Sequence, residues 1–200
     1  NHQLFGLDGP LIVEAIAREK RYVVPSLVYP PLLEDESPLS PLPYPIPGSA
    51  AMLRRFGARP AGARGLVSAL RENGTCLVFP GGAREVFKRR GESYQLRWPS
   101  DPALAKIATK FDATIVPFSA VGGDEFFGDF LLDSDDLLAN PVTADFFRQR
   151  IKKLPSFVAD DVFVPPLLTL RPEGPRRQYF LFHEPIRSRD FATPDARYAE

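Results

Sequence analysis

The first residues of the chain could perform proton-transfer chemistry. His2 and Asp8 lie just before a helical pattern that begins at Pro10 and runs to about Arg21. A neutral imidazole can accept a proton from an alcohol, and a nearby carboxylate can hold its tautomer and stabilise the imidazolium that forms. The same two residues would also suit a polar terminal loop in which Asp8 caps the helix. The sequence leaves both interpretations open.

A glycine pair in the middle of the chain supplies the second candidate site. The apolar run Thr75–Phe79 predicts a buried strand, and Pro80 ends it because proline cannot donate to a ladder. Gly81 and Gly82 then permit a sharp turn, and Arg84 and Glu85 follow directly. Glycine amides beside an arginine suit an anion. The alternative is a tight strand-to-helix turn with Arg84 in solvent.

The composition limits the classes of protein to which this sequence can belong. The 200 residues, 44% of them hydrophobic, suit one domain, and 25 basic against 25 acidic side chains lack the basic footprint of a nucleic-acid binder. The single cysteine, Cys76, excludes an internal disulfide and a cysteine zinc cluster, and it is predicted to be a core residue rather than a nucleophile. No metal-ligating set is evident. No apolar run approaches the roughly 20 residues of a membrane span.

The start of the chain and a proline-dense segment after the first predicted helix are two further features of the sequence. The chain begins at Asn1-His2 without an initiator methionine, so we expect an N-terminally truncated fragment of a longer protein. Residues 23–48 are dense in proline and predict an extended surface segment with considerable apolar surface. That segment could pack over the core or contact acyl chains.

The elements that must position the candidate residues follow from periodicity and turn signals. Helices are predicted over residues 49–56, 63–72, 100–111 and 140–153, and buried strands over 75–79, 113–118 and 178–183. Strand, helix and strand with short connections predict a right-handed βαβ unit. We therefore expect a single α/β domain, residues 1–200, with a mostly parallel central sheet flanked by helices. Ligands in such sheets lie beyond the carboxyl ends of the strands, where the Gly81 turn would project.

Four blocks of sequence, taken together, resemble a known family. They are Asn1-His-Gln-Leu-Phe-Gly-Leu-Asp8, Phe56-Gly-Ala-Arg-Pro60, Phe79-Pro-Gly-Gly-Ala-Arg-Glu85 with Arg90-Gly-Glu-Ser-Tyr94, and Ile115-Val-Pro-Phe118 with Val121-Gly-Gly-Asp124. The chain resembles a glycerolipid acyltransferase domain of the diacylglycerol acyltransferase type 2-like group, nearest to chloroplast proteins of the phytyl ester synthase type. The likeness spans nearly the whole chain, and the third block is its most specific part.

This resemblance implies a reaction and assigns roles to residues. A fatty acyl group would pass from a thioester, either acyl-CoA or acyl-carrier protein, to a lipid alcohol without a further cofactor. His2 would be the general base and Asp8 its orienting acid. Gly81, Gly82, Arg84 and Glu85 would bind substrate, as would Arg59 of the second block.

Two departures from the family pattern stand out. The broader pattern has one residue fewer between the histidine and the aspartate than the five found here, Gln3 to Leu7. The broader pattern also reads Glu-Gly-Thr-Arg where this chain reads Gly81-Gly82-Ala83-Arg84. Because the glutamate and threonine side chains are missing, a phosphate-bearing acceptor loses two partners. We therefore expect a neutral acceptor, diacylglycerol or phytol.

Other functions stay open at the level of sequence. The chain has no Gly-x-Ser-x-Gly elbow and no phosphate-loop motif, which argues against serine hydrolase and nucleotide-dependent chemistry. Alternatives are a lysophospholipid acyltransferase, an acyl thioesterase in which His2 activates water, and a noncatalytic lipid-binding module. The resemblance further implies a peripheral membrane or lipid-droplet surface, a plastoglobule or thylakoid location in the chloroplast (alternatively the endoplasmic reticulum surface), and a hydrolase-like domain towards the N-terminus of the full protein.

Overall fold

The computed structural model describes residues 2–3, 6–33, 49–97, 103–151, 164, 166–169, 171–174 and 176–190. The chain divides into two compact units. One unit is Asp8–Phe79, and the other joins Asn1–Leu7 to Pro80–Glu200. The second unit therefore contains both His2 and the Gly81 turn, although they are far apart in the sequence.

The unit Asp8–Phe79 is mainly helical. Its elements are α1 (Asp8–Lys20), β1 (Leu27–Val28), the 3-10 helix η2 (Pro30–Leu33), α2 (Ser49–Arg55), β2 (Arg59–Pro60) and α3 (Ala63–Asn73). β1 pairs with β2 in parallel, and Ser26 forms an isolated parallel bridge with Leu77. Its core includes Ile12, Val13, Leu33, Ala50, Ala58, Leu66, Ala69 and Leu77.

Local sequence explains the helices of this unit. α1 has Asp8 in its first turn and Arg18 and Lys20 in its last, so charges at both ends complement the helix dipole. α3 ends at Gly74, whose left-handed backbone (φ 71°) lets its N–H donate to the Leu70 carbonyl. These helices, with α2, confirm the three helices predicted for this part of the chain.

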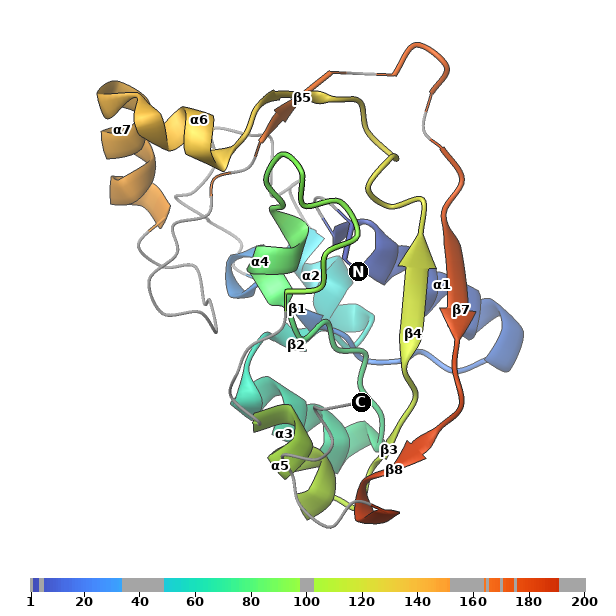
Figure 1. Ribbon diagram of the computed structural model, residues 1–200. Coiled ribbons are helices and arrows are strands. Elements are labelled where there is room, and N and C mark those ends of the chain that lie inside the picture. The colour runs from blue at the N-terminus through green and yellow to red at the C-terminus, as the bar shows by residue number, and fades with distance from the viewer. Residues whose placement is uncertain are drawn as a thin grey trace. The chain divides into compact units, whose positions relative to one another are not determined.

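The second unit carries the remaining elements. They are α4 (Gly82–Val86), α5 (Ala103–Lys110), β3 (Thr114–Ile115), β4 (Phe118–Val121), β5 (Phe130–Leu132), α6 (Ser134–Ala139), α7 (Pro141–Ile151), β6 (Leu167–Leu168), β7 (Tyr179–Phe182), β8 (Ile186–Arg187) and η3 (Ser188–Asp190). β3 pairs with β8, β4 with β7 and β5 with β6, all antiparallel. β4 and β7 lie side by side as the yellow and red arrows of Figure 1.

The expected mostly parallel central sheet is not formed by the described residues, whose strands make only two-stranded pairs. Residues 75–79 contribute just the bridge at Leu77, and the strand after α5 pairs with β8 instead. Pro117 interrupts the predicted strand 113–118, because a residue without an N–H cannot donate to a ladder, and β3 and β4 result. The late strand is present as β7, but Tyr179, Leu181 and Phe182 are exposed rather than buried.

The proline-dense segment is described only in part. Residues up to Leu33 form β1 and η2, whereas 34–48 lie outside the described residues. Within the described part of the chain, no helix has the length and apolar character needed to cross a membrane.

Replacing Gly65 by alanine is expected to destabilise the protein, although alanine usually favours a helix by about 1 kcal/mol. A Cβ at position 65 of α3 would stand only 1.9 Å from the Pro60 carbonyl oxygen. Because that oxygen belongs to the backbone, relief requires α3 to move, and we expect a net loss of about 1–3 kcal/mol in the free energy of unfolding. Urea denaturation measures it. Arg64→Ala, at the exposed neighbouring position, is the control, and equal stability of the two variants would contradict the packing described.

Candidate active site

The turn at Gly81 holds the side chain of Glu85. The Gly81 carbonyl oxygen accepts from the backbone N–H of Arg84 (3.2 Å) and of Glu85 (3.4 Å), which starts α4. The Glu85 side chain folds back against the same turn. A Cβ at Gly81 would lie 2.3 Å from Glu85 Cγ and 2.4 Å from the Arg97 carbonyl oxygen. Only glycine leaves room for Glu85 to fold back over this turn.

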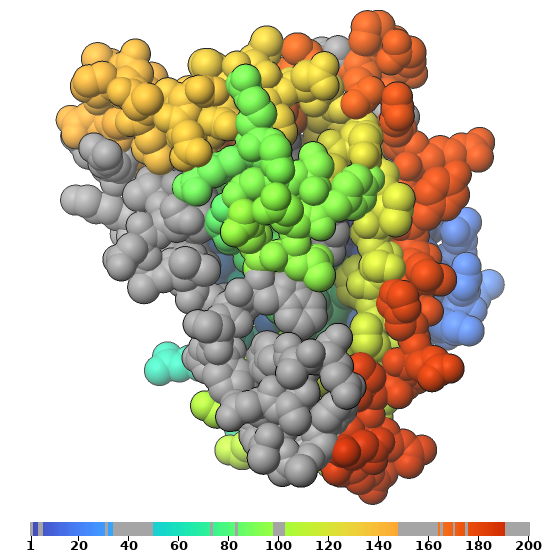
Figure 2. Space-filling model, in the orientation of Figure 1, coloured from blue at the N-terminus to red at the C-terminus, as the bar shows by residue number. Residues whose placement is uncertain are grey.

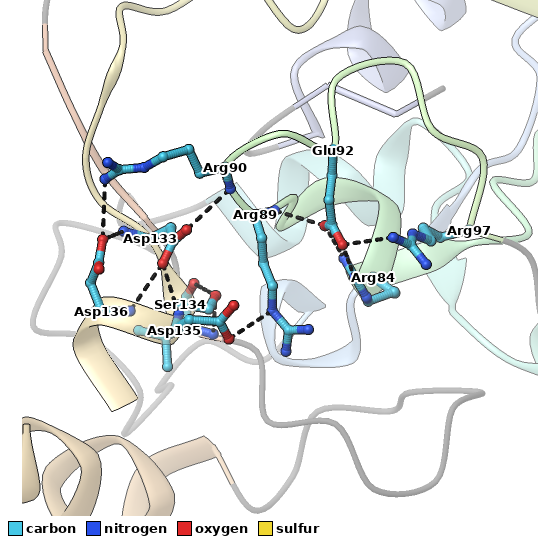
Figure 3. A network of polar contacts seen from close by, with 10 residues as sticks. Arg84, Arg89, Arg90, Glu92, Arg97, Asp133, Ser134, Asp135 and Asp136 are labelled. Carbon is cyan, nitrogen blue, oxygen red and sulfur yellow. Dashed lines mark hydrogen bonds and ion pairs between the residues drawn. The ribbon is translucent and has the colours of Figure 1, made fainter. Parts of the chain in front are cut away.

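Arg84 is engaged by a carboxylate of the chain itself. Its Nη1 donates to Glu92 Oε2 at 2.7 Å and its Nη2 to Oε1 at 2.5 Å, a bidentate pair that is almost wholly buried. Arg97 donates to the same carboxylate at 2.8 Å, so two guanidinium groups converge on Glu92 (Figure 3). The hydrogen bonds from Arg84, with lesser attraction from Arg97, lower the pKa of Glu92 to about 2. Arg84 is therefore not in solvent, and contact with a donor phosphate stays a prediction.

The basic segment that follows α4, residues 88–97, is here called the crossover. It forms ion pairs with acidic side chains along its length. Figure 2 shows this green segment exposed on one face, with α6 and α7 to one side and β4 to the other. The ion pairs are Lys88–Asp124 at 2.7 Å, Arg89–Asp135 at 3.1 Å and Arg90–Asp136 at 3.2 Å. Asp133, the capping residue of α6, also accepts from the Arg90 backbone N–H at 3.1 Å. These contacts neutralise the crossover and fix its path.

The loop after β4 is bound to the crossover as well. Asp124 accepts from Lys88 Nζ through both oxygens, at 2.7 and 2.8 Å, and from the Tyr94 backbone N–H at 2.5 Å. The Tyr94 hydroxyl donates to Glu125 and accepts from the Gly122 N–H. A cavity of about 40 Å³ lies beside Lys88 and Asp124. Since pockets for drug-sized ligands span about 300–1,000 Å³, this cavity is too small to hold a lipid substrate.

The N-terminal segment places His2 in the same unit as these residues. The Gly6 N–H donates to the Gln3 carbonyl at 2.9 Å, and this turn brings the imidazole against Gly6, where an added Cβ would stand 3.4 Å from Cε1. Gln3 is fully buried, and its Cβ would lie 3.6 Å from a Cβ built on Gly123. His2 itself is half-buried.

Glu85 is a carboxylate held almost out of water, with 1% of its surface exposed. Burial is the largest influence on the pKa of Glu85 and raises it. The residue predicted to touch substrate thus lies in the interior.

Asp8 and Arg59 lie in the other unit. Asp8 is fully buried at the start of α1, where its Oδ1 accepts from the Gly9 N–H at 3.0 Å. A capping side chain accepts from the amide two or three residues further on, so this contact is not a capping bond, and a role beside His2 stays a prediction. Arg59 in β2 pairs with Glu72 at 2.5 Å. Burial raises the pKa of Cys76 to about 12, so its thiol is protonated at neutral pH and is a poor nucleophile.

Sequence reasoning missed some of the residues that build the site. Glu92 lies in the third block of the family resemblance, yet no local signal indicated that it would pair with Arg84 and Arg97. Asp124 likewise ended the fourth block without a predicted partner. Gln3 had no signal beyond its place next to His2.

Two curated proteins are similar in sequence to this chain. The chain is 33% identical over 198 residues to phytyl ester synthase 1, chloroplastic, of Arabidopsis thaliana, covering 94% of this chain and 27% of that protein. It is also 33% identical over 139 residues to phytyl ester synthase 2, chloroplastic, of the same plant, covering 66% of this chain and 19% of that protein. The chain thus spans about a quarter or less of the curated relatives it matches. No family model and no solved structure matches.

These matches establish homology to the two phytyl ester synthases and thereby support the resemblance noted in the sequence. Membership of the wider diacylglycerol acyltransferase type 2-like group stays a prediction.

Removal of the Glu92 charge is expected to weaken the protein in a pH-dependent way. The pKa of Glu92 is about 2 in the folded protein against an ordinary value of 4.5. A depressed folded value means that the carboxylate stabilises the fold above pH about 4.5 and that this stabilisation disappears as pH falls towards 2. Urea midpoints of wild type and Glu92→Gln should therefore differ most at neutral pH and converge on acidification. Gln95→Ala, an exposed uncharged neighbour, should shift the midpoint equally at every pH. A difference in urea midpoint between wild type and Glu92→Gln that stays constant with pH would contradict the lowered pKa of Glu92.

Proposed function

We propose that this chain is an acyltransferase domain that moves a fatty acyl group from a thioester to a neutral lipid alcohol. The observation that carries the proposal is similarity over 94% of the chain to a protein named as a phytyl ester synthase. A phytyl ester joins an acyl group to phytol, so its synthesis requires an acyl donor and that alcohol. Because the chain spans 27% of that relative, the activity of the whole protein belongs to the proposal.

The proposed reaction is a direct transfer with His2 as general base. The imidazole accepts the proton of the alcohol as the alcohol oxygen attacks the thioester carbonyl carbon. The carbon–sulfur bond then breaks, and the imidazolium returns the proton to the departing thiolate. The products are an ester and a free thiol, and no oxidant or reductant is needed. A positioned base of this kind contributes roughly 10²–10⁴-fold to the rate.

In this proposal the turn at Gly81 has a supporting role. It positions a side chain of the site and does not bind the negatively charged oxygen that forms when the thioester is attacked. Because Glu85 folds back against Gly81, where an added Cβ would stand 2.3 Å from Glu85 Cγ, we assign Gly81 to holding that side chain. Gly82 keeps its predicted place in substrate binding. The thioester carrier, acyl-CoA or acyl-carrier protein, is likewise part of the proposal.

Engagement of the cationic side chains favours a neutral acceptor. Arg84 is paired with Glu92, Arg59 with Glu72, and Arg54 donates to the Leu33 carbonyl oxygen. Burying a phosphate dianion without paired cations is far more costly than burying a hydroxyl. We therefore propose phytol or diacylglycerol in preference to lysophosphatidic acid.

Both relatives are named as chloroplastic, and we propose the same location for this chain. Its place there would be the surface of a thylakoid membrane or plastoglobule, where a lipid alcohol is accessible. The endoplasmic reticulum surface is the alternative.

His2→Ala should lower ester formation by about 10²-fold or more with the fold intact, because the alcohol would lose its base. His183→Ala provides a matched control, since the side chain of the other histidine of the chain hydrogen-bonds Ser119 through Nε2 at 2.9 Å. Circular dichroism checks folding, and radiolabelled ester reports activity. A His2→Ala variant with more than about a hundredth of wild-type activity would remove His2 from the mechanism.

The acceptor is tested by competition. With one acyl donor and equal phytol and lysophosphatidic acid, we expect acylation of phytol to dominate, because the paired arginines leave a phosphate poorly compensated. Thin-layer separation of the two products measures the ratio. Preferential acylation of lysophosphatidic acid would show that those ion pairs open for substrate, and the neutral-acceptor assignment would be wrong.

A further inference from the structure

The β4–β7 pair presents an apolar face to the outside. In the antiparallel register Val121 lies opposite Tyr179. Ser119 lies opposite Leu181 two residues along, so these four side chains share one face. Val121, Tyr179 and Leu181 are 56%, 62% and 62% exposed, whereas Ala120 on the other face is buried. Contiguous apolar side chains on an outward face mark a site of interaction.

Backbone contacts hold this face in place. Gly122, which follows β4, has a left-handed backbone (φ 91°), and an added Cβ there would stand 2.2 Å from the Arg177 carbonyl oxygen. Its N–H donates to the Tyr94 hydroxyl at 3.1 Å. Asp124, two residues further on, accepts from Lys88 and from the Tyr94 backbone N–H. The apolar face is therefore connected to the crossover of the candidate site by the loop that follows β4.

Positive charge accompanies this face along the chain. Arg176 and Arg177 come shortly before β7, and Arg187 lies in β8. All three side chains are exposed, and none forms an ion pair with a residue that the structure describes. From Arg171 to Asp190 the sequence has five arginines against three acidic residues, whereas the whole chain is neutral. Unpaired cations beside an apolar face complement a lipid surface that carries negative charge.

A lipid surface suits this face better than a second copy of the chain does. A second copy would bring the same excess of positive charge to the interface, where like charges repel. In a lipid surface Val121 and Leu181 would enter the acyl region, and Tyr179 would lie at the level of the headgroups with its hydroxyl in water. The arginines would contact anionic headgroups, and binding would combine buried apolar area with electrostatic attraction.

We propose that this face, formed by Val121, Tyr179 and Leu181 and accompanied by Arg176 and Arg177, docks the chain on a lipid surface with anionic headgroups. The inference rests on the proposed function, because a hydrophobic alcohol that accepts the acyl group is dissolved in such a surface. The loop after β4 connects the docked face to the crossover, so docking brings the unit that carries the candidate base to its substrate.

Flotation with lipid vesicles tests the docking without reference to activity. The whole chain should bind vesicles of equal parts phosphatidylcholine and phosphatidylglycerol, and bind vesicles of phosphatidylcholine alone more weakly. Tyr179→Ser with Leu181→Ser should weaken binding to both by about tenfold or more, because two apolar side chains no longer enter the lipid. Val142→Ser is the matched control, since this α7 side chain is 79% exposed and its loss should leave binding unchanged. Circular dichroism checks that each variant folds.

The arginines are tested separately, because their exposed positions outside the strands tolerate substitution. Arg176→Gln with Arg177→Gln should reduce binding to the anionic vesicles by about tenfold or more and leave binding to phosphatidylcholine alone unchanged. Failure of the wild type to bind either vesicle, or binding that survives both double substitutions, would overturn the proposal. So would a dimer, seen by sedimentation equilibrium, that Tyr179→Ser with Leu181→Ser converts to a monomer, because the face would then belong to an interface between copies.

Activity separates this inference from the proposed function. With phytol held in the anionic vesicles, Tyr179→Ser with Leu181→Ser should slow ester formation by about tenfold or more, in step with the loss of binding. With butanol in free solution, the same variant should match the wild type. An unchanged rate with vesicle-held phytol, or an equal loss with both alcohols, would overturn the docking role and leave the proposed function standing. Absence of ester from the wild type would overturn the proposed function, and flotation alone would then decide whether this face docks on lipid.

Discussion

The buried ion pair between Arg84 and Glu92 is the interaction on which the rest of the candidate site depends. It joins α4 to the crossover that follows, and Glu92 also accepts from Arg97 and from the Arg89 backbone. Removing one partner of a buried pair leaves a charge uncompensated and typically costs about 3–5 kcal/mol. With α4 fixed, the Gly81 turn is fixed, and Glu85 is held in the interior. The Lys88–Asp124 pair extends the same restraint to the loop after β4.

Much of the helical structure could be predicted from the sequence, and little of the strand pairing. α1, α2, α3, α5 and α7 carry local signals such as end charges, a glycine cap and apolar periodicity. Strand pairing depends on residues distant in sequence, and the short spacing from residues 75–79 to 113–118 suggested neighbours that the described strands do not form. β3 finds β8 and β4 finds β7 much later in the chain. Pro117 marked where the strand would break, but not which strands would pair.

The candidate site shows the same division between local and distant information. The turn at Gly81 and the candidate role of His2 begin from residue types that can be seen in the sequence. The partner of Arg84 could not be seen, because no local signal indicated that Arg84 would meet Glu92 in the segment that follows α4. Arg84 pairs with Glu92 and so holds α4 in place, and its contact with an anionic substrate stays a prediction. The family resemblance assigned Asp8 as the acid beside His2, and that role stays a prediction; Asp8 Oδ1 accepts from the Gly9 N–H.

The most direct test of acyl transfer is product analysis with a labelled acyl thioester, in the presence and absence of phytol. Wild-type protein should yield labelled ester that depends on phytol, with little free fatty acid, because His2 activates the alcohol in preference to water. Free acid that forms at the same rate with or without phytol would contradict the account and identify a thioesterase. Neither product, from folded protein, would contradict it equally and indicate a lipid-binding module.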